Sequence, residues 1–248
     1  MSGKNTITDT IVLEGRNVTK NFSGLKAVAN VDIALHEHEI LGLIGPNGAG
    51  KTTLFNMLSG TMAMTEGELY YRGNKVHNPK ADKMCKMGIG RTYQICQPFS
   101  NLTVLENTMV GAFAHVSKTS EAREIGKEIL QKVGLYHRAN ASGSSLTLPE
   151  LKRMEVARAL ATKPDVLLLD EVIAGLNPTE VEKIMELIRN IRDEGMSIII
   201  IEHVMRAIMN LSDRIVVLNH GEKIAEGLPE DIANDQRVIE SYLGGGKH

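Results

Sequence analysis

The chain has 248 residues, enough for one large α/β domain or two modest ones. Hydrophobic residues make up 42% of it and charged residues 23%, so a packed core and a solvated surface are both expected. The net charge of −2 argues against nucleic acid as an obligate partner. Residues 1–6 lack the apolar core of a signal peptide, and no stretch approaches the roughly 18 apolar residues that span a bilayer. We therefore expect a soluble protein that meets a membrane only through a partner.

The first part of the chain predicts strands followed by a helix. Residues 11–40 alternate apolar and polar side chains between glycines, which is typical of short antiparallel strands. The apolar run 39–44 stops at a Gly/Pro/Asn cluster, and helical periodicity begins at Lys51 and continues to about Leu58. A second hairpin is predicted around residues 67–73.

Two later segments are almost entirely aliphatic, at residues 166–169 and 198–201. Continuous apolar runs of this length favour parallel strands that are buried on both faces. Helical patterns cover about 149–163 and 179–194, and this alternation of strand and helix indicates an open α/β sheet. Two more short strands are predicted at 213–218 and 222–226, and two short surface helices at 227–243.

Residues 95–162 differ in character from the strands around them. They include the charged, helical segment 118–135 and a Ser/Gly-rich patch at 142–145. We interpret this region as a mostly helical insertion between strands of the sheet.

Residues 45–52 match the phosphate-binding pattern G-x-x-x-x-G-K-[ST]. Its glycines let successive backbone N–H groups surround the phosphates of a nucleotide, and the helix that begins at Lys51 directs its positive dipole end at them. Lys51 adds a full charge, and the Thr52 hydroxyl is placed to ligate Mg²⁺. A chance glycine-rich turn is the alternative, but the match follows a predicted strand and opens a predicted helix. The nucleotide-binding residues predicted here are Gly45, Asn47, Gly48, Ala49, Gly50, Lys51, Thr52 and Thr53.

The aliphatic run 166–169 is followed by Asp170 and Glu171. A buried parallel strand that ends in a carboxylate places it at the edge of the sheet where ligands of α/β proteins bind. Asp170 suits the Mg²⁺ shell, and Glu171 is placed to orient and deprotonate a water for attack on the γ-phosphate. An ordinary strand end with two surface acids is the alternative.

The order of these motifs resembles the nucleotide-binding subunits of ABC transporters over nearly the whole chain. The resemblance implies an α/β fold, a P-loop NTPase core of the ABC-ATPase type with an antiparallel β subdomain and a helical subdomain. One such domain would fill residues 1–248. The β subdomain and P-loop core would take 1–94 and 163–226, the helical subdomain 95–162, and C-terminal helices with a tail 227–248.

The same resemblance implies roles for residues outside the two motifs. Phe22 lies where the family stacks an aromatic ring on adenine, and Val28 would flank that ring; a core Phe is the alternative. Gln94 matches the glutamine that senses Mg²⁺ and the attacking water, although Gln97 competes for the assignment. His203, after the run 198–201, resembles the switch histidine that contacts the γ-phosphate, whereas an isolated His is more often a surface residue.

The family's signature loop, commonly LSGGQ, aligns here with residues 146–150. Thr147 keeps a hydroxyl where Ser is expected, but Pro149 replaces a glycine and has no N–H to donate to a phosphate. The start of a helix nevertheless suits Pro. Val172 also departs from the family, which usually has Pro after the acidic pair. The missing donor motivates the hypothesis of a heterodimer in which this loop serves the weaker site; a homodimer is the alternative.

The resemblance implies an ATPase that uses ATP and Mg²⁺ and binds integral membrane permease subunits at the cytoplasmic face of the plasma (inner) membrane. Two ATP-binding subunits would enclose two ATP molecules, with residues 174–177 crossing their interface. Residues 22–28, 88–94 and 213–219 look like the ATPase subunits of branched-chain amino acid importers, and related urea and short-amide importers are similar there. The rivals are a soluble ABC-type ATPase in translation, DNA repair or cluster assembly, and a regulatory module with little hydrolysis.

Overall fold

The structure is a computed structural model, and it is described here for residues 9–92 and 98–243. Its centre is a six-stranded sheet in the order β10-β9-β3-β8-β7-β6. β3, β9, β8, β7 and β6 run parallel, and β10 pairs with β9 in the antiparallel sense. The strands are β3 (Ile40–Ile44), β6 (Ile89–Arg91), β7 (Val166–Asp170), β8 (Ser197–Ile201), β9 (Arg214–Asn219) and β10 (Glu222–Gly227).

The central strands are buried on both faces, and alternate residues enter two separate cores. Ile198 and Ile200 of β8 pack with the helices on one face. Ile199 and Ile201 pack on the opposite face with α1 (Lys51–Leu58) and the second sheet. Every residue of β3, β7 and β8 is buried, which confirms the interpretation of the aliphatic runs as parallel strands covered on both sides.

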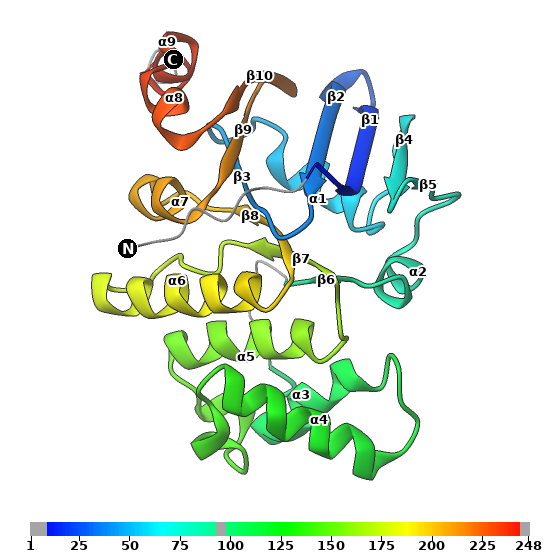
Figure 1. The fold of residues 1–248 in the computed structure, drawn as a ribbon, viewed down its shortest axis with the longest axis vertical. Helices are drawn as coiled ribbons and strands as arrows, with labels where there is room; N and C mark the ends of the chain where they lie inside the picture. The colour runs from blue at the N-terminus through cyan, green and yellow to red at the C-terminus, as the bar shows by residue number, and fades with distance from the viewer. Residues whose placement is uncertain (1–8, 93–97, 244–248) are drawn as a thin grey trace.

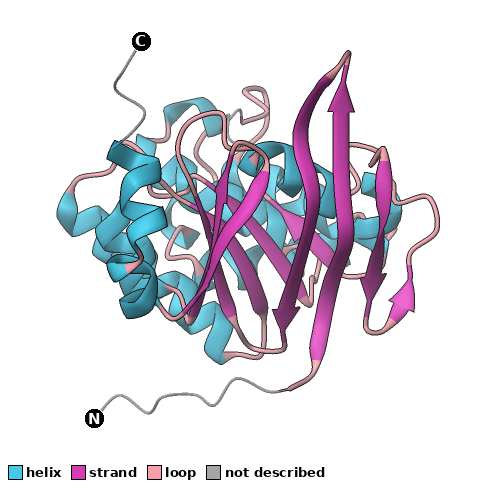
Figure 2. Cartoon of the chain, turned by 90° about the horizontal axis from the view of Figure 1, so that it is seen from above, coloured by secondary structure: helices cyan, strands magenta, loops and turns pink. Residues whose placement is uncertain are grey.

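The second sheet is antiparallel and has the order β2-β1-β4-β5. It contains β1 (Ile11–Phe22), β2 (Leu25–His36), β4 (Glu66–Tyr71) and β5 (Asn74–Lys75). The prediction of short strands over 11–40 is wrong in length, because β1 and β2 remain paired for 12 residues each across several register shifts. Figure 2 shows these long strands beside the central sheet.

Helices cover the other face of the central sheet, and those between β6 and β7 lie at one end of the molecule (Figure 1). The region 98–162, between β6 and β7, is mostly helical as predicted. It holds α3 (Val104–Ala112), α4 (Thr119–Lys132), α5 (Leu148–Leu160) and two short 3₁₀ turns, Tyr136–Arg138 and Gly143–Ser145. The other helices are α2 (Ala81–Lys86), α6 (Pro178–Asp193), α7 (Met205–Leu211), α8 (Pro229–Asn234) and α9 (Gln236–Leu243).

The last two helices confirm the prediction of two short helices after residue 227. Across 9–92 and 98–243, the helices all fall short of the combined length and hydropathy that crossing a bilayer requires.

The parallel strands bring distant parts of the chain to one edge of the central sheet. β3 pairs with β8, and β8 pairs with β7, all in parallel, so their carboxyl ends lie together. In register, Leu43 of β3 lies opposite Ile201 of β8, and Ile201 lies opposite Asp170 of β7. The segment that follows each of these strands therefore begins at the same edge.

Candidate functional site

The segment after β3 is the phosphate-binding loop, and its glycines are required by geometry. Gly45, Gly48 and Gly50 have φ of 149°, 79° and 99°, a region that side chains disfavour. A Cβ atom on Gly45 would lie 2.1 Å from the Leu218 carbonyl oxygen, and one on Gly50 would lie 2.4 Å from the Ala27 oxygen. At Gly48 the space is open. The loop is thus pressed against its neighbours at two glycines and exposed at the third.

Lys51, the first residue of α1, lies within this loop and is buried. Its Nζ donates to the carbonyl oxygens of Gly45, at 2.7 Å, and Pro46, at 3.0 Å. Burial lowers the pKa of the Lys51 ammonium, and the nearby carboxylates of Glu171 and Asp170 offset part of that effect. The loop therefore holds a cation whose donors contact its own main chain.

A pocket of about 420 Å³ opens over this loop. It brings Glu171 and His203, from the ends of β7 and β8, together with the loop and the start of α1. Residues to which the sequence analysis gave no role in binding also contribute: Leu25, Lys26 and Ala27 from the start of β2, and His220 from the turn between β9 and β10. The complete lining is Leu25, Lys26, Ala27, Asn47, Gly48, Ala49, Gly50, Lys51, Thr52, Thr53, Glu171, His203 and His220.

The two residues predicted to contact adenine do not line this pocket. Phe22 is exposed at the end of β1, with the Lys20 ammonium 5.1 Å from the centre of its ring. Val28 is completely buried, and its Cγ2 atom would lie 3.3 Å from a Cβ on Gly50. In this conformation Val28 packs against the loop at Gly50.

Asp170 ends β7 and is 2% exposed. The Thr92 hydroxyl oxygen accepts its backbone N–H at 3.0 Å, and the Arg91 guanidinium lies 3.8 Å from Oδ2. Among the described residues its Oδ1 has no hydrogen-bond partner. Burial raises the pKa of the Asp170 carboxyl, while Arg91 opposes the rise. A buried carboxylate oxygen whose lone pairs are not used by these neighbours suits a hard cation such as Mg²⁺.

The described part of the chain has no cluster of three or more His, Cys, Asp or Glu side chains that could hold a metal. A cation here would depend on Asp170, on the Thr52 hydroxyl at the pocket wall and on oxygens from a ligand and water. Such sparse protein ligation is the usual arrangement for Mg²⁺ bound with substrate phosphates.

Glu171 and His203 lie against each other in the pocket wall. His203 Nε2 is 2.8 Å from Glu171 Oε1, and the Glu171 backbone N–H donates to the Ile201 carbonyl at 3.0 Å. Glu171 has φ of 51°, in the left-handed region that non-glycine residues seldom occupy. The main chain therefore turns sharply at the strand end, at the residue predicted to be the base.

Glu202 was not singled out by the sequence, yet it is 2% exposed beside this turn. Its Oε1 accepts the backbone N–H of Ile173 at 2.7 Å, and Oε2 has no hydrogen-bond partner in the described parts of the chain. Burial raises the pKa of the Glu202 carboxyl to about 7.

The signature segment begins α5 and lies away from the pocket. Thr147 is exposed, and both its N–H and its O–H donate to the Glu150 carboxylate, at 2.8 and 3.0 Å. Pro149 lies in the first turn of the helix, where its missing N–H costs no intrahelical bond. No described residue between 98 and 162 lines the pocket. The structure thus leaves Thr147 apart from the loop at 45–52 within one chain.

Two other positions complete the comparison with the sequence. Gln94 lies outside the described residues. Val172, which stands where the family usually has Pro, is 2% exposed and belongs to the core that contacts the helices.

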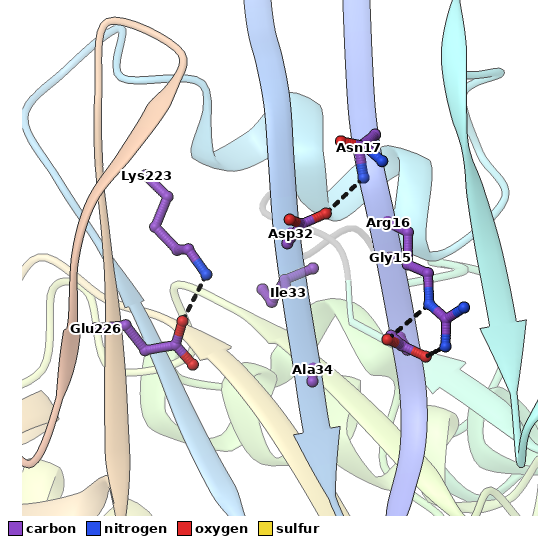
Figure 3. Close-up of a pocket in the computed structure, with 9 residues that line it drawn as sticks. Gly15, Arg16, Asn17, Asp32, Ile33, Ala34, Lys223 and Glu226 are labelled. Atoms are coloured by element: carbon purple, nitrogen blue, oxygen red, sulfur yellow. Dashed lines mark hydrogen bonds and ion pairs between the residues drawn. The ribbon is translucent and has the colours of Figure 1, made fainter.

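A second pocket, of about 370 Å³, lies between β1, β2 and the β9–β10 hairpin (Figure 3). Its charged side chains are paired locally. Arg16 binds Glu14, Lys223 binds Glu226, and Asp32 accepts the backbone N–H of Asn17. It also has no phosphate-binding loop, so the pocket over residues 45–53 is the better nucleotide site.

We predict that Glu202 makes stability depend on pH. Its pKa is near 4.5 when exposed and about 7 when folded, so between these values the unfolded chain binds fewer protons and stability falls as pH rises. The slope is up to about 1.4 kcal/mol per pH unit. Glu202→Gln removes this ionisation, so its stability relative to wild type should rise by about 2.5 kcal/mol between pH 5 and pH 8.

Urea unfolding at four pH values across this range measures the effect. Glu182→Gln, at an exposed position of α6, is the control and should keep the wild-type slope. A Glu202→Gln profile parallel to that of wild type would contradict the prediction.

Comparison with known proteins agrees with this geometry. The family profile "ABC transporter" matches residues 28–174, and "Branched-chain amino acid ATP-binding cassette transporter" matches residues 222–248. The high-affinity branched-chain amino acid transport ATP-binding protein LivG of Salmonella typhimurium is 41% identical over 90% of this chain and 94% of its own length.

Two solved structures are similar over most of the fold. A nucleotide-free ATP-binding cassette from an ABC transporter has a TM-score of 0.87 at 29% identity, covering 94% of this chain and 98% of that one. A dimeric, post-hydrolysis ATP-binding cassette bound to ADP and Pi has a TM-score of 0.79 at 28% identity, covering 88% and 98%. The family match, the relative and the fold agree: this chain belongs to the ATP-binding, ATP-hydrolysing proteins of the ABC transporter family.

Proposed function

We propose that this chain binds and hydrolyses ATP to drive import through a membrane transporter. The observation that carries the proposal is that loop residues 47–53, Glu171 and His203 line one pocket. A donor-rich loop and a carboxylate–imidazole pair are then within reach of the same triphosphate. This is the arrangement that phosphoryl transfer to water requires.

The proposed roles follow from the chemistry of each group. The loop amides and Lys51 bind the phosphates, and Lys51 exchanges its bonds to Gly45 and Pro46 for phosphate oxygens. Asp170 and Thr52 would hold Mg²⁺, which neutralises phosphate charge when bound. Glu171 accepts a proton from the attacking water, and His203 orients that carboxylate and contacts the γ-phosphate. Phe22 and Val28 remain proposed adenine contacts, and Gln94 a proposed Mg²⁺ sensor.

We propose further that a second ATP-binding subunit completes the site. The pocket lacks any described contribution from the signature segment, and Thr147 is exposed at the start of α5. A partner's signature loop would therefore cover this nucleotide while Thr147 faces the partner's. The dimeric cassette bound to ADP and Pi supports such an assembly. Pro149 offers no N–H, which favours a heterodimer with unequal sites.

The membrane subunits would bind where the helical region meets the core. A groove of about 450 Å³, mostly apolar, lies between α2, α3, α5 and β6. Val110 and Phe113 are exposed at its rim, 40% and 46% respectively. An exposed apolar groove of this kind is typical of a binding surface. We propose a permease segment as the occupant of this groove, at the cytoplasmic face of the inner membrane.

We also propose a division of the chain into subdomains. The β subdomain and P-loop core take residues 1–94 and 163–226, the helical subdomain takes 95–162, and the C-terminal helices and tail take 227–248.

The proposed cargo is a branched-chain amino acid or a related small polar solute. Two observations support it: the family match of residues 222–248 and the name of the relative LivG. Both observations are similarities to other proteins, so the support for the cargo comes from sequence similarity.

Two substitutions test the ATPase. Lys51→Ala removes the phosphate-binding cation, so ATP affinity should fall at least ten-fold and turnover should be lost.

Glu171→Gln keeps the shape of the side chain but cannot accept the proton, so ATP should bind with near wild-type affinity while turnover falls at least a hundred-fold. Equilibrium titration with ATP and a phosphate-release assay measure the two effects. Normal hydrolysis by Glu171→Gln would remove the proposed base.

The unequal-dimer proposal predicts that purified chain alone hydrolyses ATP at least ten-fold more slowly than the assembled transporter. A phosphate-release assay on both samples at equal site concentration checks this. Equal rates would argue against a required partner subunit.

The cargo proposal predicts that leucine, isoleucine or valine stimulates ATP turnover of the transporter reconstituted in vesicles. Urea and short amides are the comparison solutes, and a charged amino acid is the control. Stimulation by none of these solutes would contradict the proposed cargo class.

A further inference from the structure

The turn at residues 171–173 is held from two sides by buried charged side chains. Lys152 projects from α5 and is 6% exposed, and its Nζ donates to the Glu171 carbonyl oxygen at 2.6 Å. Glu202, which follows β8, accepts the Ile173 N–H at 2.7 Å. Both contacts are made to the main chain, so they fix the path of the turn.

This turn needs such support. Glu171 adopts the left-handed conformation, which is unfavourable for a residue with a side chain, and that conformation persists only where surrounding contacts maintain it. Its N–H is bonded to Ile201 and its carbonyl to Lys152. Without the ammonium, the Glu171 carbonyl loses a charge-assisted hydrogen bond. The carboxylate would then have more freedom around its present direction.

We propose that Lys152 is a positioning residue for hydrolysis: from α5 it holds the main chain of Glu171 so that the carboxylate points into the nucleotide pocket. Glu202 holds the other end of the same turn. Neither side chain lines the pocket, so each acts through Glu171 and makes no contact with nucleotide. The inference rests on the proposed role of Glu171 and extends it.

The position of Lys152 gives this contact a second consequence. Thr147, which caps the start of α5, faces the partner's nucleotide in the proposed dimer, and Lys152 lies five residues further along the same helix. Thr147 and Lys152 therefore lie on one helix, the first directed to the proposed partner and the second bonded to this chain's own Glu171.

A purely structural role is the competing explanation, because Lys152 also lies among buried acids. Its charge favours the ionised forms of Glu155, Asp170 and Glu202 and opposes the rise in their pKa values. Loss of the ammonium through that role would weaken folding and ATP binding together. Loss of positioning would lower turnover and leave ATP binding intact. The separation of binding from turnover distinguishes the two.

The test uses Lys152→Met, Lys152→Arg and, as a matched control, Arg153→Met. Lys152→Met keeps an unbranched side chain but has no donor, so turnover of the assembled transporter should fall at least ten-fold while the ATP dissociation constant of the full chain stays within two-fold. Lys152→Arg keeps the donor and should recover at least half of the wild-type rate. Arg153→Met loses the same charge one position along α5 and should keep the wild-type rate. If Lys152→Met does not fold, Lys152→Gln replaces it with the same expectation.

Either of two outcomes would overturn the inference. One is near wild-type turnover in Lys152→Met, and the other is a loss of ATP affinity that matches the loss of turnover. Measurements on the wild-type chain distinguish failure of this inference from failure of the proposed function. A wild-type chain that neither binds nor hydrolyses ATP with Mg²⁺ refutes the function itself. A wild type that hydrolyses ATP while Lys152→Met does the same refutes only the role of Lys152.

Discussion

The site depends on the burial of three adjacent parallel strands, β3, β8 and β7, on both faces. Because every residue of these strands is buried, their register is fixed by two cores at once, and a slip of one residue would exchange the faces. Their carboxyl ends therefore stay aligned. The phosphate-binding loop and His203 follow two of these ends, and the acidic pair lies at the third, so a rigid sheet positions groups that are more than 150 residues apart in sequence.

Much of the fold was predictable because its signals are local. The aliphatic runs at 166–169 and 198–201 and the start of α1 at Lys51 lie where the structure has them. Other elements were missed for physical reasons. β6 has only three residues, too few for a periodic pattern, and it is a strand because Gly90 pairs with Leu167 of β7. α3 begins with a Thr103–Glu106 capping box, a signal present in the sequence that the prediction did not use.

The site itself was predictable in part. The glycine-rich loop and the acidic pair are recognisable because their chemistry depends on residue types at fixed spacing. Leu25 and His220 reach the pocket only because the β1–β2 hairpin and the β9–β10 hairpin lie beside it. The contacts of Lys152 and Glu202 could not be predicted, because both partners are main-chain atoms. Backbone carbonyl and amide groups are common to nearly all residue types, so the sequence does not indicate which of them will be bonded. Only the folded geometry identifies which one is used.

The bonds from Lys51 to its own loop have a consequence for how tightly a ligand can bind. An ammonium already satisfied by the Gly45 and Pro46 oxygens gives up two good acceptors when it turns toward a phosphate. The favourable free energy of binding is the difference between two charge-assisted arrangements, which is smaller than the full attraction of a bare cation for an anion. This exchange also lowers the free energy required for release, because the ammonium regains partners within the loop as the product departs. A subunit that releases nucleotide in every cycle benefits from a cation that has hydrogen-bond acceptors within its own loop.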